Sequence, residues 1–155
     1  MRSWILTLLT SLLPMLVAPF AAAAVGPTVE QAWARATPPG VDVGAVYLTI
    51  VGGPAADRLT SATTARASMV HLHTIEESGG VAKMRAVEGI EVPAGKRVVL
   101  APKGTHIMLM GLGRPLVAGE KFSLTVRFEK VGDRTVEVVV QPASADGPTA
   151  SASAH

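Results

Sequence analysis

Hydrophobic and polar residues alternate along much of the chain after residue 24, in short runs separated by turn residues. The clearest alternation spans residues 122–128, where every second side chain is Phe, Leu or Val and the others are Ser, Thr and Arg. A period of two residues predicts a strand with one buried face. We expect strands at 28–36, 43–51, 59–64, 68–75, 81–87, 97–100, 106–111, 122–128 and 136–140.

The same pattern predicts the fold class. No segment shows an apolar period of 3.6 residues over a helical length, so we expect an all-β protein. Frequent Gly and Pro between the strands favour a single antiparallel β-sandwich or a barrel. The turn at 78–80 joins two strand-like runs and predicts a β-hairpin, which places Met84 on the strand beside the one that carries His73.

The two ends of the chain differ from its middle in composition. After a basic second residue, an apolar run over 4–20 leads into four alanines at 21–24, which is typical of a secretory signal peptide. We expect cleavage after Ala24 or one of the two alanines before it, and no stable membrane insertion afterwards; an uncleaved anchor is the alternative. The predicted organisation is a cleaved signal peptide (1–24), one domain (25–141) and a flexible Ala/Ser-rich tail (142–155).

Charge and cysteine content exclude several functions. The formal net charge is +2, and it becomes +1 when Arg2 leaves with the signal peptide, so nothing favours binding of nucleic acid. A chain without cysteine has no disulfide and no thiolate ligand, which excludes a blue-copper electron-transfer centre. We also find no nucleophile–base pair, acidic dyad or phosphate loop, and expect no enzymatic activity.

Soft metal donors stand at fixed spacings in this chain. They form the array H-x10-M-x21-H-x-M, made of His73, Met84, His106 and Met108. The run 105–110 alternates, so His106 and Met108 would share one strand face with aliphatic residues on the other, and the run 69–73 does the same for His73. Thioether sulfur is soft and uncharged, and it suits Cu(I) better than zinc, magnesium or calcium. The sequence therefore predicts a site for a soft metal.

The alternative is that these methionines are ordinary core residues. It is strongest for Met84 taken alone, because one methionine between two basic residues could simply point inward. Three of the four histidines, however, fall in the same two runs as the other methionines, which favours a metal site. The roles of Met69, His71 and Met110 on the same faces stay open: His71 could compete as a ligand, stabilise Cu(II), or only form a hydrogen bond. His155 lies in the predicted tail and is taken as incidental.

The array resembles that of the periplasmic copper chaperones of the PCu(A)C family. Segments 32–40, 83–85, 89–95 and 106–112 also look like signatures of that family, so the resemblance covers most of the chain after residue 24. It implies a cupredoxin-like Greek-key β-sandwich in an exported, periplasmic protein. It also implies one Cu(I) per chain, bound by His73, Met84, His106 and Met108. His71 lies outside the family pattern, and it leaves open an auxiliary site for Cu(II).

The resemblance further implies a role in copper delivery. Copper would pass towards the Cu(A) centre of cytochrome c oxidase, with oxidase subunit II and Sco-type thiol proteins as partners. Thioether ligands at a surface are readily displaced by a partner's thiolates, which gives the transfer a direction. A copper storage or resistance protein that uses the same donors is the main alternative, and a purely structural β-sandwich is the other. The acceptor and the oligomeric state stay open.

Overall fold

The computed structural model describes residues 25–149, and the all-β expectation is confirmed for this part of the chain. The predicted signal peptide (1–24) and the last six residues of the predicted tail (150–155) lie outside the described residues. Within the described part, no helix is long and apolar enough to cross a membrane. The strands are β1 (Thr28–Arg35), β2 (Val43–Val51), β3 (Asp57–Thr63), β4 (Ala67–Ser78), β5 (Val81–Ala86), β6 (Ile90–Val92), β7 (Arg97–Leu100), β8 (His106–Leu112), β9 (Lys121–Phe128) and β10 (Gly132–Gln141).

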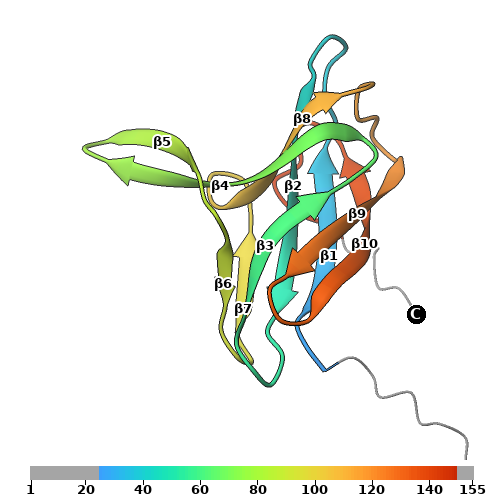
Figure 1. Ribbon diagram of the computed structural model, residues 1–155. Coiled ribbons are helices and arrows are strands. Elements are labelled where there is room, and N and C mark those ends of the chain that lie inside the picture. Colours follow the sequence, from blue (N-terminus) through green and yellow to red (C-terminus); the bar gives the residue numbers. More distant parts are fainter. Residues whose placement is uncertain (1–24, 150–155) are drawn as a thin grey trace, which may run out of the picture.

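The strands hydrogen-bond into one sheet that curls around a common core (Figure 1). Their order is β5-β4-β8-β2-β1-β10-β9-β3-β6, and β7 pairs with the part of β2 that β8 leaves free. Pairings between the described strands are antiparallel with one exception, because β1 runs parallel to β10. The β4–β5 hairpin projects away from the body of the sandwich (Figure 1). This topology puts β4, β5 and β8, which carry the candidate donors, side by side at one edge of the sheet.

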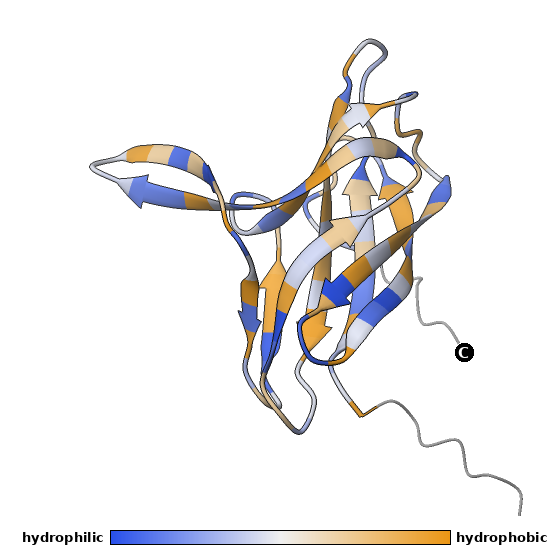
Figure 2. Ribbon diagram, viewed as in Figure 1, coloured by the Kyte–Doolittle hydropathy of each residue, from blue (hydrophilic) through white to orange (hydrophobic). Residues whose placement is uncertain are grey.

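The core consists of the apolar faces of the strands other than β5. The alternation of hydrophilic and hydrophobic residues along the strands is visible in Figure 2. The four apolar side chains of β9 are all buried, as the pattern at 122–128 predicts. On β8, Ile107 and Leu109 are completely buried at 0% exposure. The removal of these aliphatic side chains from water contributes most to fixing each strand in its register. As a result, the His/Met face of β8 points away from the core.

All nine strands expected from the sequence are present, and a tenth was missed. β6 has only three residues, and three residues are too few to show an alternation. Val92 of β6 is nevertheless fully buried, and the strand pairs with β3 at the far edge of the sheet. The parallel pairing of β1 with β10 was not expected either, because alternation reports which face is buried and says nothing of strand direction.

The first residues after the predicted domain boundary contact the sandwich. The Nε of Arg35 on β1 donates to the carbonyl oxygen of Ala145 at 2.7 Å, and its Nη2 pairs with Asp146 at 2.7 Å. The side-chain amide of Gln141, at the end of β10, donates to the hydroxyl of Thr149 at 2.8 Å. The described part of this segment therefore lies against β1 and β10.

Candidate metal centre

Three cross-strand pairs line up on the outward face of β4 and β8. In register order they are His73 opposite His106, His71 opposite Met108, and Met69 opposite Met110. The residues between them, such as Leu72 opposite Ile107, turn to the core side. Residues directly opposite each other on antiparallel strands have Cβ atoms about 5 Å apart, close enough for side chains to share a ligand. The fold thus brings three of the four predicted donors together on one surface.

His106 is the most enclosed of these residues, with an exposed fraction of 4%. Its Nδ1 lies 2.9 Å from the carbonyl oxygen of Gly104, in the turn that precedes β8. A carbonyl oxygen can only accept, so Nδ1 carries the proton and donates, and Nε2 keeps its lone pair. Metal-binding histidines are commonly oriented by such a bond from the other ring nitrogen. The Tyr47 ring, with its centroid 6.3 Å from that of His106, forms an aromatic wall beside the imidazole.

His73 lies next to His106, with ring centroids 5.9 Å apart and the planes inclined at 69°. Its Nδ1 is buried and has no hydrogen-bond partner among the described residues. A buried polar atom without a partner costs free energy, and it calls for an explanation such as a metal ion. Burial lowers the pKa of His73 below its ordinary value of 6.5, and the neighbouring His106 and His71 lower it further. The ring is therefore neutral at pH 7, the state in which imidazole binds metals.

Met84 reaches the same face from β5. The register of the hairpin sets Met84 opposite Ile75 and Ala86 opposite His73, so Met84 is a diagonal neighbour of His73, with Cβ atoms roughly 7 Å apart. Lys83 and Arg85 face the other side, where Arg85 pairs with Glu76. The side chain of Met84 is 51% exposed. All four predicted donors therefore lie on one face of three adjacent strands, with Met84 at the outer edge.

The donor set limits the chemistry available at this face. Within residues 25–149, no three His, Asp or Glu side chains gather into a cluster that could hold a metal ion. A metal site at this face therefore needs donors beyond the histidines, and the methionines on the face, Met84 and Met108 among them, can supply sulfur. Two imidazoles and two thioethers are neutral together, and thioether donors favour Cu(I) over harder cations. The residues present fit a soft monovalent metal.

Sequence reasoning missed two residues that shape this face. Gly104 orients His106 through a backbone carbonyl, and a backbone contact leaves no mark on the choice of side chain. The only available signal was the turn at 102–104 immediately before the histidine. The ring of Tyr47 packs at a tilt against that of the buried Trp33, with centroids 4.7 Å apart and planes inclined at 41°. Its position beside His106 depends on the pairing of β2 with β8, which a linear pattern does not reveal.

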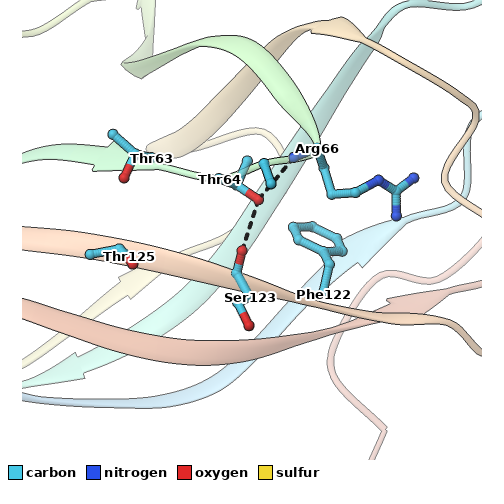
Figure 3. A pocket seen from close by; sticks show the side chains of 7 residues that line it. Thr63, Thr64, Arg66, Phe122, Ser123 and Thr125 are labelled. Carbon is cyan, nitrogen blue, oxygen red and sulfur yellow. Dashed lines mark hydrogen bonds between the residues drawn. The ribbon is translucent and has the colours of Figure 1, made fainter.

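A second feature with polar residues lies elsewhere, in a hollow between the end of β3 and the start of β9 (Figure 3). Its polar groups are already engaged with each other. The Thr64 hydroxyl donates to the carbonyl oxygen of Ser123 at 2.8 Å and accepts from the backbone N–H of Arg66 at 3.3 Å. The Arg66 guanidinium lies over the Phe122 ring, 5.6 Å from its centroid, and pairs with Glu120 at 2.8 Å. We therefore interpret this hollow as a structural junction.

Comparisons with known proteins agree with the fold and with a copper-binding site. The model of a family described as LpqE-like, "Putative lipoprotein LpqE-like", matches residues 27–140. The protein "Putative lipoprotein Lxx21020" of Leifsonia xyli subsp. xyli (strain CTCB07) is 38% identical over 117 residues, which cover 75% of this chain and 70% of that protein.

Two solved structures extend the comparison. The copper-bound PCuAC domain from PmoF2 has a TM-score of 0.66 at 25% identity, covering 78% of this chain and 97% of that domain. The solution structure of CuI-DR1885 from Deinococcus radiodurans has a TM-score of 0.62 at 32% identity, covering 80% of this chain and 83% of that chain. The expectation of a cupredoxin-like sandwich is confirmed, and both of these similar proteins hold copper.

Proposed function

The chain belongs to the LpqE-like family, which includes copper-binding PCuAC domains, and from that premise we propose that it is an exported Cu(I) chaperone. In this proposal His73, Met84, His106 and Met108 bind one Cu(I) per chain. Copper is cargo here and no substrate is turned over. The protein acts in the periplasm and passes its copper towards the Cu(A) centre of cytochrome c oxidase.

The observation that carries the proposal is that the two neighbouring imidazoles differ in their hydrogen bonding. His106 donates its Nδ1 proton to Gly104 and so offers Nε2. His73, beside it, has a buried Nδ1 with no partner among residues 25–149. A buried nitrogen without a hydrogen-bond partner lowers the stability of a purely structural sandwich. Next to an oriented imidazole, the same nitrogen can serve a metal site. This arrangement supports the two histidines as the inner half of the site.

The exposure of the sulfur donors supports transfer. Met84 is half exposed at the outer edge of the sheet, whereas His106 is buried. An acceptor could therefore approach from the side of β5 and replace the thioether of Met84 while the two imidazoles are still bound to copper. Thiolate is charged and binds Cu(I) more strongly than a neutral thioether does, so exchange runs towards a cysteine-bearing acceptor. Sco-type thiol proteins and oxidase subunit II are the proposed acceptors.

Cu(I) binding can be tested by competition with a chromophoric chelator under anaerobic conditions. We expect Met84→Leu and Met108→Leu each to weaken Cu(I) binding by at least tenfold, because leucine keeps the volume and removes the sulfur. Met84 is exposed, so Met84→Leu should leave the thermal midpoint unchanged. Val81→Ala is the matched control: Val81 lies on the same strand, is 55% exposed and faces the other side. Wild-type affinity in both methionine variants would refute the site.

A transfer assay separates the chaperone from copper storage, the alternative that uses the same residues. The Cu(I)-loaded protein is mixed with the copper-free Cu(A) domain of an oxidase subunit II and a Sco-type thiol protein. Samples taken at intervals are treated with a one-electron oxidant such as ferricyanide, which converts the delivered copper to the absorbing mixed-valence centre, and the Cu(A) absorption is recorded. A chaperone metallates the acceptor faster than the same amount of free copper. A slower rate than free copper would replace delivery by storage and leave the binding site intact.

A further inference from the structure

The face of β4 and β8 carries one more pair of soft donors than the proposed copper site uses. Met69 and Met110 lie directly opposite each other in the register, at the end of the row that begins with His73 and His106. Met69 is 53% exposed, and Met110 is only partly buried. Large apolar side chains that face water forfeit the benefit of burial. Met69 gains little from burial, and Met110 gains only part of it, so this pair adds little to stability.

His71 links this pair to the rest of the row. It is exposed, pairs directly with Met108, and lies two residues from Met69 on the same strand face. Its ring centroid is 6.2 Å from that of His73. Successive pairs on one face are about 7 Å apart along the strands, so His71 is a diagonal neighbour of Met110. One imidazole and two thioethers thus surround a single patch of surface.

The end of the row is held in place by Gly111. Its φ is +67°, a left-handed conformation that suits glycine, and a Cβ there would lie 2.8 Å from the Oγ of Ser68. That hydroxyl donates to the carbonyl oxygen of Gly111 at 3.2 Å. The contact joins β4 to β8 immediately beside Met69 and Met110. The backbone that carries both methionines is therefore fixed by this contact between β4 and β8.

We propose that Met69, His71 and Met110 form a second soft-metal site that binds one further Cu(I). The site adjoins the first one, because Met108 of the first site and His71 of the second face each other. Two thioethers and one imidazole form a neutral set with no carboxylate, which favours a monovalent soft cation over Cu(II) or zinc. The set has fewer donors than the first site and is more open to water, so its affinity is lower. This site stands on its own residues and does not depend on the chaperone role.

Stoichiometry with paired variants tests the proposal. Purified protein is titrated anaerobically with Cu(I) and, separately, with Ag(I), a redox-inert soft cation. We expect two equivalents in the wild type and one in Met69→Leu/Met110→Leu, with the tighter affinity unchanged. We expect one equivalent, bound with the weaker affinity, in Met84→Leu/Met108→Leu. Leucine matches methionine in size, so folding should be preserved, and thermal midpoints check this.

A spectroscopic readout assigns the ligands directly. With methionine methyl groups labelled with carbon-13, Ag(I) should shift the methyl signals of Met69 and Met110 in the Met84→Leu/Met108→Leu variant, and His71→Gln should abolish the shift. The second site is overturned if Met69→Leu/Met110→Leu binds as many equivalents as the wild type, or if the wild type binds only one. Failure of the first site has a different signature, because Met84→Leu/Met108→Leu would then match the wild type at the tighter affinity.

Discussion

Glu120 is a largely buried carboxylate that is paired with two arginines. It immediately precedes β9 and accepts hydrogen bonds from the Nη1 atoms of Arg66 and Arg114, both at 2.8 Å. The side chains of Arg66 and Glu120 are only 14% and 19% exposed. The Arg66 hydrogen bond, helped by that from Arg114 and opposed by partial burial, lowers the pKa of Glu120 from 4.5 to about 2. We predict that Glu120→Gln destabilises the protein at neutral pH.

The magnitude follows from the change in pKa. A fall from 4.5 to about 2 corresponds to roughly 3 kcal/mol, at about 1.4 kcal/mol per pKa unit. Arg114 is 61% exposed, so solvent screens its share, and we expect a loss of about 2–3 kcal/mol. Glu120 is more acidic in the folded chain than in the unfolded chain. Its stabilisation is therefore fully present above pH 4.5 and is lost as the pH falls from there towards about 2.

Urea unfolding, followed by the fluorescence of the buried Trp33, measures this effect. The free energy of unfolding is compared between wild type and Glu120→Gln at several values from pH 7 down to pH 3. We expect the difference to shrink as the pH falls below 4.5. Glu137→Gln is the control, since its ion pair with Lys121 is exposed on both sides and should change the stability by less than about 1 kcal/mol. A difference between wild type and Glu120→Gln that is independent of pH, or below 1 kcal/mol at pH 7, would refute the reasoning.

Three further outcomes are expected. Asp57→Ala should lower the free energy of unfolding by about 2–4 kcal/mol in urea titrations, because the buried carboxylate accepts three backbone N–H groups at 2.7, 3.0 and 3.2 Å; a change below 1 kcal/mol would contradict this. Gly111→Ala should cost about 1–3 kcal/mol by the same measurement, since φ there is +67° and the new Cβ meets Ser68; an unchanged stability would argue against the strain. Adding Cu(I) at about 100 times its Kd should stabilise the fold by roughly 2.7 kcal/mol. The thermal midpoint should rise and return to its original value when a chelator is added; an unchanged midpoint would count against tight binding.

The strands of the candidate site could be predicted because their alternation is strict. On β8 the aliphatic residues and the His/Met residues occupy opposite faces, so burial of Ile107 and Leu109 fixes where His106 and Met108 must point. The hairpin followed from the Gly-Gly turn in the same way, and with it the strand that carries Met84. In each case the information is local to a few residues, which is what a sequence pattern can hold.

Contacts between distant segments could not be predicted. The parallel pairing of β1 with β10 joins the two ends of the described domain, and no residue type marks it. Asp57 reads as one acidic residue in a loop-like stretch, yet it is 4% exposed. Burial raises its pKa, but hydrogen bonds from backbone N–H groups outweigh this and leave the pKa below 3.8. Such networks depend on the meeting of loops that are far apart in sequence, and only the folded chain displays them.

The projecting β4–β5 hairpin has a consequence for motion. All six side chains of β5 are exposed, so β5 is held by its ladder to β4 with little apolar burial behind it. Segments of this kind open locally at a small fraction of the free energy of global unfolding. Amide protons of β5 should accordingly exchange with solvent far sooner than those of β8. A ligand that joins Met84 to the histidines of β4 and β8 would have to suppress this opening, so part of its binding free energy is spent on ordering the hairpin. Opening of the hairpin moves Met84 away from the histidines, so an acceptor that binds the open form competes with a lower copper affinity than that of the closed form.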